Sequence, residues 1–259
     1  MFNNFSYRQF SVTGGPTFFN FSAVSSTVRM EPAIEAWAAT GATVQQVEPD
    51  PGNDGFFFVG YKVTGPNAGL WHYEYAVFNM NLDRAIQSFQ VFFGFPVPLS
   101  NIDFHAPPQE PGWANDGTVG DAGYSSAPWS VDEGTGSALT WSSETIAQDP
   151  NANAIRWGTL YNFRFDSSAP PSGSQATIGF FKTGSPVTVD IVAPFMSDVT
   201  PTATATVTVS PTPTATATAT ISPPPTPTVT VTPTATPRVT PTPRSHPTAR
   251  PRPTPAPRP

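Results

Sequence analysis

The chain has 259 residues and divides into two pieces of opposite composition. Residues 200–259 hold 17 of the 33 prolines together with 20 threonines and five arginines, but no aromatic and no acidic residue. Residues 1–199 therefore hold all 32 aromatic residues, and their 18 acidic residues against 7 lysines and arginines give a net charge of −11. That charge argues against a nucleic-acid partner, which requires clustered lysine and arginine. No run approaches the length of a membrane span.

The two compositions predict one folded domain and one linker. A chain of ~150 residues or more buries roughly 70% of its surface on folding, so residues 1–199 are long enough for a core. A segment without aromatic residues cannot bury enough apolar surface to offset the entropy lost on ordering it. We therefore expect a folded domain over 1–199 and a disordered Pro/Thr-rich stalk over 200–259.

Short aromatic and β-branched runs, separated by Gly, Pro, Asn and Asp, fill the first 199 residues. This pattern is typical of antiparallel sandwiches and barrels. The runs predict strands over 17–22, 43–47, 55–63, 70–79, 87–95, 138–141, 159–166, 176–182 and 187–193. We therefore expect an all-β, mainly antiparallel domain of the β-sandwich type.

Two of these runs have aromatic side chains at three successive alternate positions. Successive residues of a strand point to opposite faces, so residues two apart share a face. The aromatic faces consist of Trp71, Tyr73 and Tyr75 in the first run, and of Tyr161, Phe163 and Phe165 in the second. We expect these rings to lie on facing or paired strands, with most of them buried.

One short helix is predicted over 32–40. Pro32 suits the first helical position, and Gly41 provides a natural stop. Ile34 and Trp37 are three residues apart and would both point onto the sheet. The stretch 100–136 is longer than an ordinary loop, so it is either functional or contains strands that the pattern does not reveal.

Polar residues on the predicted strands offer one kind of site. His72 and Glu74 lie on one face of a strand, roughly 7 Å apart, and could bind a metal or act as an acid–base pair. Arg164 and Asp166 form a second such pair. The alternative is a network that pairs charges across strands. No HExxH, GxSxG or GxxxxGK[ST] pattern occurs, and no catalytic residue is predicted.

Two oxygen-rich turns offer a second kind of site. Calcium takes about six to eight oxygen ligands from such loops. The candidate ligands are Asp50, Asn53 and Asp54 in the first turn, and Asp116 and Asp121 in the second. The same residues are also ordinary turn formers. No other cofactor is expected, and the absence of cysteine removes thiolate ligands and thiol nucleophiles.

Aromatic residues in the loop-rich stretch offer a third kind of site. Trp113, Tyr124 and Trp129 could present exposed rings on which sugar rings stack, because loops on a rigid scaffold often carry binding residues. The alternative is that these rings cover an edge of the sandwich. Glycans or other surface polymers are therefore the expected partners.

Three segments resemble a known group of proteins. They are WHYEYAVFNMNLDR over 71–84, QDPNANAIRWGTLYNFRFD over 148–166 and TIGFFK over 177–182. Together they resemble the C-terminal region of large secreted bacterial proteins of unassigned function, over roughly residues 6–185. One departure is Asp149, where the pattern usually has Asn. The resemblance implies secretion and supplies no catalytic residue.

The start of the chain differs from those proteins, which carry an export signal and a long N-terminal region. The first ten residues lack the basic and apolar segments of a signal peptide. We therefore expect this chain to be a C-terminal fragment or the product of a mis-started gene.

These observations favour an extracellular, non-catalytic module for surface display, adhesion or carbohydrate binding, carried on a Pro/Thr stalk. One alternative is a secreted, glycosidase-like hydrolase or an accessory domain of one. The other is a purely structural part of a larger surface protein. A marked nucleophile or metal triplet would favour the enzyme, and exposed tryptophan and tyrosine rings would favour the binding module.

Overall fold

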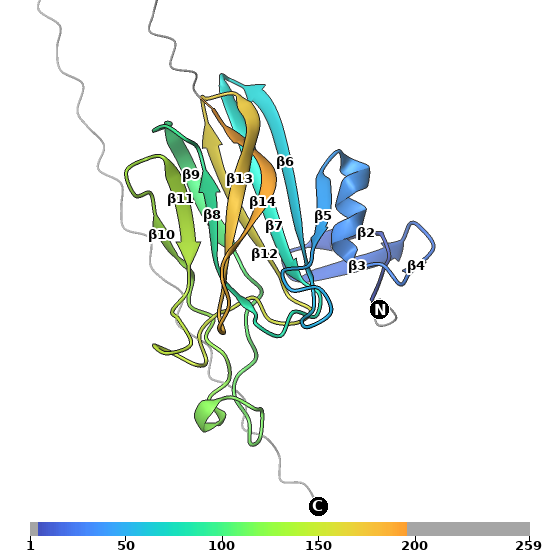
Figure 1. Cartoon of the computed structure of the whole chain (residues 1–259). Coiled ribbons are helices and arrows are strands. Elements are labelled where there is room, and N and C mark those ends of the chain that lie inside the picture. Colours follow the sequence, from blue (N-terminus) through green and yellow to red (C-terminus); the bar gives the residue numbers. More distant parts are fainter. Residues whose placement is uncertain (1–4, 196–259) are drawn as a thin grey trace, which may run out of the picture. The chain divides into compact units, whose positions relative to one another are not determined.

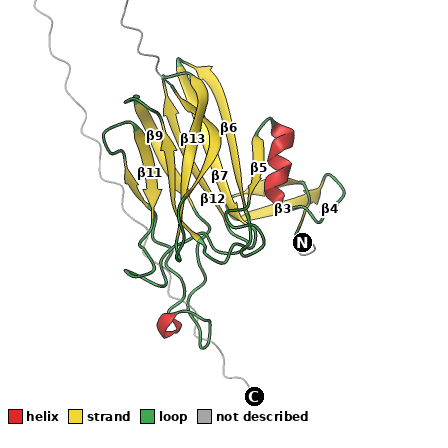
Figure 2. Cartoon of the chain, in the orientation of Figure 1, coloured by secondary structure: helices red, strands yellow, loops and turns green. Residues whose placement is uncertain are grey.

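The computed structural model describes residues 5–195, so the predicted domain boundary at 199 and the predicted stalk lie outside the described residues. The described part is mostly antiparallel β-structure, as the alternating runs predicted. Two five-stranded sheets face each other as a β-sandwich and enclose the main hydrophobic core (Figure 1). Figure 2 shows that strands dominate this part of the chain and that its helical segments are short.

The first sheet has the strand order β10-β11-β8-β13-β14. Its members are β8 (Ile86–Phe92), β10 (Ser130–Asp132), β11 (Ala138–Ser142), β13 (Pro171–Phe180) and β14 (Val187–Pro194). The second sheet has the order β5-β6-β7-β12-β9. Its members are β5 (Thr43–Val47), β6 (Phe57–Asn67), β7 (Leu70–Asn79), β9 (Leu99–His105) and β12 (Leu160–Ser167).

Shorter elements lie outside the two sheets. Before the sandwich, β1 pairs with β4 and β2 pairs with β3. Their bounds are β1 (Ser6–Tyr7), β2 (Phe10–Gly15), β3 (Phe18–Ala23) and β4 (Val28–Arg29). The 3₁₀ helix η1 (Ala33–Thr40) precedes β5, and the single turn η2 (Val119–Asp121) lies in the long loop between β9 and β10.

All nine predicted strands are present, with shifts of a few residues at their ends. The pattern missed the short strands β1, β4 and β10 and the longer strands β2 and β9. The stretch 100–136 contains most of β9 and all of β10. Asn101 in β9 has a φ of 52°, a left-handed conformation that breaks the regular alternation of a strand.

The predicted helix is confirmed and packs on the outer face of the second sheet. Pro32 is extended and immediately precedes the helix, and Gly41 ends it at a φ of 88°. Ile34 is buried, and the Trp37 ring lies against Gly60, where an added Cβ would come within 2.8 Å of the ring. A glycine in β6 thus allows the helix to approach the sheet closely.

The core is built around the pairing of β7 with β12. The register sets Tyr75 opposite Phe163 and Tyr73 opposite Phe165, and all four rings are fully buried. Phe163 also stacks across the sandwich on Phe89 of β8, with ring centroids 4.6 Å apart. The predicted aromatic faces are therefore confirmed, and they meet the opposite sheet as one layer of rings.

We expect Phe163→Ala to lower the free energy of unfolding by ~3–5 kcal/mol, because a large ring is removed from a site that neighbouring rings cannot refill. Denaturant unfolding measures this change. Phe92→Ala is the control, since Phe92 is 49% exposed on β8 and its loss should cost about 1 kcal/mol or less. Equal effects of the two substitutions would contradict this description of the core.

Burial of tyrosine hydroxyls predicts a loss of stability in alkali. Burial raises the pKa of Tyr161 to about 12 and raises the pKa values of Tyr73 and Tyr75 as well. Unfolded tyrosine loses its proton near pH ~10, so the unfolded chain releases protons first and the stabilisation falls as pH rises beyond that value. Ultraviolet absorbance should show these three tyrosinates forming only as the domain unfolds. Ionisation of all tyrosines at pH ~10 with the fold intact would contradict this expectation.

Candidate functional site

Loops at the lower end of the sandwich in Figure 1 surround an open cleft of about 550 Å³. The connection from β7 to β8 contributes Leu82 and Asp83, and the long loop before β10 contributes Val119 and Tyr124. The connection from β11 to β12, residues 143–159, completes the central part of the lining. Segments far apart in sequence thus meet at this end of the domain.

Arg156 forms a fixed part of the cleft wall. Its guanidinium carbon lies 3.6 Å from the centroid of the Tyr124 ring, the geometry of a cation–π contact. The same guanidinium donates hydrogen bonds to the carbonyls of Ala152, at 2.7 Å, and Pro150, at 3.4 Å. Burial lowers the pKa of Arg156, and the neighbouring Tyr124 opposes this effect. The arginine therefore orients the Tyr124 ring and the 150–154 segment together.

Trp157 presents the largest exposed ring of the cleft. The residue follows Arg156 directly, lines the cleft and is 63% exposed. Exposed apolar side chains of Val119 and Ile146 share the lining. Ligand sites commonly combine aromatic walls with a few polar groups in fixed positions, and this cleft has that composition.

Asn151 attaches the long loop to the cleft. Its side-chain oxygen accepts the backbone N–H of Val119 at 2.9 Å, and its side-chain nitrogen donates to the Val119 carbonyl at 2.9 Å. One amide side chain therefore satisfies both backbone groups of a residue 32 positions away. The contact holds the η2 turn against the segment that carries Trp157.

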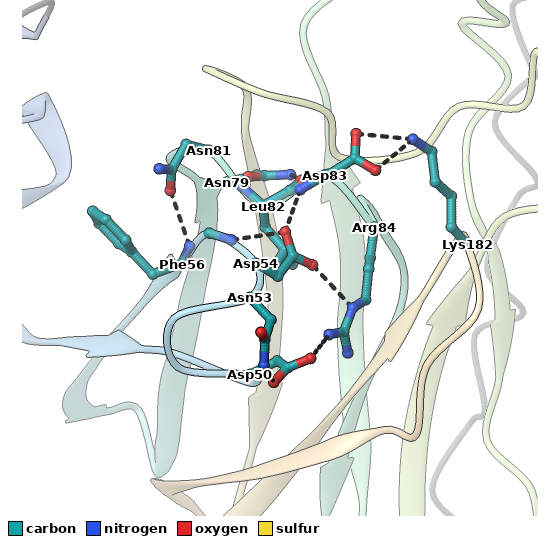
Figure 3. A network of polar contacts seen from close by, with 11 residues as sticks. Asp50, Asn53, Asp54, Phe56, Asn79, Asn81, Leu82, Asp83, Arg84 and Lys182 are labelled. Atoms are coloured by element: carbon teal, nitrogen blue, oxygen red, sulfur yellow. Dashed lines mark hydrogen bonds and ion pairs between the residues drawn. The ribbon is translucent and has the colours of Figure 1, made fainter. Parts of the chain in front are cut away.

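An ion-pair network centred on Arg84 lies next to Asp83, which lines the cleft (Figure 3). Arg84 Nη2 lies 2.6 Å from Asp50 Oδ2, and Arg84 Nε lies 2.9 Å from Asp54 Oδ2. The other oxygen of Asp54 accepts the backbone N–H groups of Gly55 and Asp83, at 2.7 and 2.9 Å. The network thus joins the turn before β6 to the connection that follows β7.

Two neighbouring contacts hold Leu82 and Asp83 at the cleft. Asn79 is fully buried, accepts the Leu82 N–H at 2.7 Å and donates to the carbonyls of Leu82 and Ile155, both at 3.0 Å. Lys182 Nζ lies 2.9 Å from Asp83 Oδ2 at the rim, as Figure 3 shows. The N–H and carbonyl of Leu82 and the N–H and carboxylate of Asp83 therefore each have a specific partner.

The predicted calcium ligands have other partners in the structure. The Asp50 and Asp54 carboxylates pair with Arg84, and hydrogen bonds from Asn53 and Arg84 lower the pKa of Asp50. In the second turn, Asp116 accepts the Thr118 N–H at 2.7 Å, and Asp121 Oδ1 accepts the Asn115 N–H at 3.1 Å. Within residues 5–195, no three His, Asp or Glu side chains are arranged to hold a metal ion.

The three residues of the predicted aromatic site lie in different environments in the structure. Tyr124 lines the cleft, whereas Trp113 is 60% exposed and does not belong to the cleft lining. The prediction for Trp129 needs correction, because its ring is 4% exposed and stacks on Phe104 within the core. Its indole N–H donates to the Asn153 carbonyl, which satisfies the polar end of the ring.

Trp157 is the residue that sequence reasoning missed as a binding candidate. It stands in the second of the segments that carry the family resemblance, next to Gly158 and just before β12. The alternating pattern begins only after it, so nothing in the sequence assigns its ring to the core. An aromatic residue that lies just before an alternating strand, and outside its pattern, is a candidate for an exposed ring, and this signal would have identified Trp157.

The residues of the two predicted polar pairs lie in two sets of contacts on the outer face of the second sheet. His72 Nδ1 lies 2.6 Å from Asp166 Oδ1, and His72 Nε2 lies 3.5 Å from Glu74 Oε2. Arg164 pairs with Asp103 of β9. Hydrogen bonds from Asn101 and His72 lower the pKa of Asp166. The contacts are those of the alternative raised from the sequence, in which charges pair across neighbouring strands.

Comparisons of the chain with family models, with curated proteins and with solved structures find no match. Among residues 5–195, no helix has the length and apolar character that a bilayer crossing requires. A function for this domain is therefore inferred from the geometry and the charges of the cleft.

We expect Arg84→Met to lower the free energy of unfolding by about 3 kcal/mol or more, because it leaves the Asp54 carboxylate buried without a cation. The Asp54 side chain is only 8% exposed. Lys182→Met is the matched control, since both side chains of the Lys182–Asp83 pair are about half exposed or more and its loss should cost about 1 kcal/mol or less. Thermal unfolding that ranks the two variants in the opposite order would contradict the role given to Arg84.

Proposed function

We propose that the domain is an extracellular, non-catalytic module that binds a neutral glycan in the cleft beside Trp157. The observation that carries the proposal is an exposed indole ring that lines the same cleft as the Tyr124 ring, which Arg156 holds in place. Flat aromatic faces offer large contact area to a sugar ring, and side chains already held in place lose little entropy when a ligand binds. The polar groups beside them would set the orientation of the ligand.

The charges at the cleft support a neutral ligand. The Arg156 guanidinium donates to a carbonyl oxygen and contacts the Tyr124 ring. The Lys182 ammonium forms an ion pair with Asp83. The cationic groups of the described lining are therefore already paired. The net charge of −11 over residues 1–199 would also repel an anionic polymer.

The carboxylates of the cleft favour binding over the alternative of a glycosidase. Most glycoside hydrolases place a pair of carboxyl groups on either side of the bond that is cleaved. The described lining contributes one, Asp83, and it is paired with Lys182. A purely structural module remains the competing proposal, and a glycan-binding experiment separates it from this one.

The family resemblance adds support for location and for the site. The three segments that carry it all reach the cleft, the first through Asp83, the second through Arg156 and Trp157, and the third through Lys182. The proteins that they resemble are secreted, which supports action outside the cell. The Pro/Thr-rich segment 200–259 has the composition of a spacer, which supports surface display or adhesion.

We expect the full chain to bind neutral oligosaccharides on a glycan array at both low and high salt, because ring stacking does not depend on long-range charge. Trp157→Ala should abolish this binding and leave thermal stability unchanged, because the Trp157 ring is mostly exposed. Trp113→Ala is the matched control, with an equally exposed ring outside the cleft, and should bind as the unmodified chain does.

Three outcomes of the array would contradict this proposal. Binding that is lost in Trp113→Ala but kept in Trp157→Ala would place the site on the long loop. Binding to anionic glycans that disappears at high salt would indicate recognition by charge. A silent array would favour the purely structural module.

A further inference from the structure

Residues 6–29 form a two-stranded ribbon outside the sandwich. The pairing of β1 with β4 closes its base, and the pairing of β2 with β3 forms its outer part. Between these pairs, Arg8 Nε donates to the Ser25 carbonyl at 2.7 Å. Figure 1 shows the ribbon on the side of η1, apart from the two five-stranded sheets. Phe5 links the base to the domain through an edge contact with Phe78, at 5.6 Å.

The outer ribbon is amphipathic and its apolar face is uncovered. The register sets Val12 opposite Phe21 and Phe10 opposite Ala23, with Phe19 on the same face opposite Gly14. Phe10, Val12, Phe19 and Phe21 are between 47% and 67% exposed. The other face carries the hydroxyl and amide side chains of Ser11, Thr13, Asn20 and Ser22, with one exposed ring, Phe18, at the turn. One side of the ribbon thus has the character of a sheet face that normally packs on a core.

An uncovered face of this kind is unfavourable in water. An isolated two-stranded hairpin is at best marginally stable, and a hydrophobic face needs a further layer to cover it. Within residues 5–195, no other part of the chain covers these four side chains, which are all exposed. Covering this face would therefore stabilise the ribbon.

The charge distribution indicates which partner fits. Residues 9–28 contain no charged residue, whereas the domain as a whole carries −11. Two copies of so acidic a domain repel each other over most of their surfaces. The ribbon is a long uncharged surface where that repulsion is weakest, and the charges that flank it, Arg8 and Arg29, are positive and would attract the acidic surface of another copy.

The area of the face is sufficient for self-association. A fully covered phenylalanine buries ~150–250 Å², so the exposed parts of the three rings and of Val12 leave on the order of 400 Å² of apolar surface. Two copies would bury on the order of 800 Å² of it, and homodimer interfaces are roughly 65% apolar, which gives a total near ~1,200 Å². Stable complexes bury about 1,200–2,000 Å² in total.

We propose that the apolar face of the β2–β3 ribbon is a homodimer interface, in which the ribbons of two copies pack face to face about a two-fold axis. Such an interface uses the same surface on both copies. The face satisfies this requirement because its apolar side chains can pack against the same side chains of a second copy. The Arg8 guanidinium, 5.8 Å from the centroid of the Phe10 ring, is a charge at its edge near the base.

Sedimentation velocity of the full chain across the micromolar range tests this proposal. The unmodified chain should sediment as a dimer, and the double variant Phe19→Ser with Phe21→Ser should dissociate roughly 100-fold more readily, as expected when two central rings are removed. The control is the double variant Phe92→Ser with Phe95→Ser, which removes two rings of similar exposure elsewhere and should remain dimeric. Near-ultraviolet circular dichroism verifies that each variant is folded.

Three results would overturn the proposal. The first is an unmodified chain that stays monomeric throughout the concentration range. The second is a dimer that persists at unchanged affinity without Phe19 and Phe21. The third is a monomer that binds phosphatidylcholine vesicles through these rings, which would assign the face to a lipid surface. None of these results depends on glycan binding, so the two proposals are tested separately.

Discussion

Burial of the rings on β7 and β12 is the constraint on which the remaining structure depends. Tyr75 opposite Phe163 sets the register of the second sheet, and a shift of one residue would turn every buried ring outward. The same register places His72 beside Asp166 on the outer face, so the outer charge network is a consequence of the inner packing. It also brings the end of β7 and the start of β12 to the end of the sandwich where the cleft lies.

Strands with aromatic residues along one face could be predicted from the sequence. Their period-two alternation can be recognised in the strand itself, without knowing which strand pairs with it. It was not predictable for β9, where Asn101 interrupts the alternation with a left-handed residue. The site was harder to predict, since the cleft joins loops through contacts such as that of Asn151 with Val119. Tyr124 was predicted as a candidate because it is an aromatic residue in a loop, and it does line the cleft. The same reasoning predicted an exposed ring for Trp129, which is buried against Phe104 of β9, a strand that was not predicted.

The loops around the cleft and the β2–β3 ribbon differ in how they use charged side chains. At the cleft, Arg84 and Arg156 are used internally, the first to hold two carboxylates and the second to hold a tyrosine ring and backbone carbonyls. They link neighbouring loops through internal contacts, so their charges are paired or covered. At the ribbon, charge is absent over residues 9–28 and apolar rings are exposed instead. A dimer joined there would carry two clefts, and two linked sites bind a repetitive surface more tightly than either alone.

The most direct test of the proposed site uses the indole N–H resonances of the six tryptophans, observed by nuclear magnetic resonance. The ligand is a neutral oligosaccharide that the array selects, added in increasing amounts to the full chain. The proposal predicts that the resonance of Trp157 moves with saturable dependence on ligand, while those of the buried Trp129 and Trp141 do not move. Movement of Trp113 with Trp157 unchanged, or no movement of any indole resonance, would contradict a glycan site in this cleft.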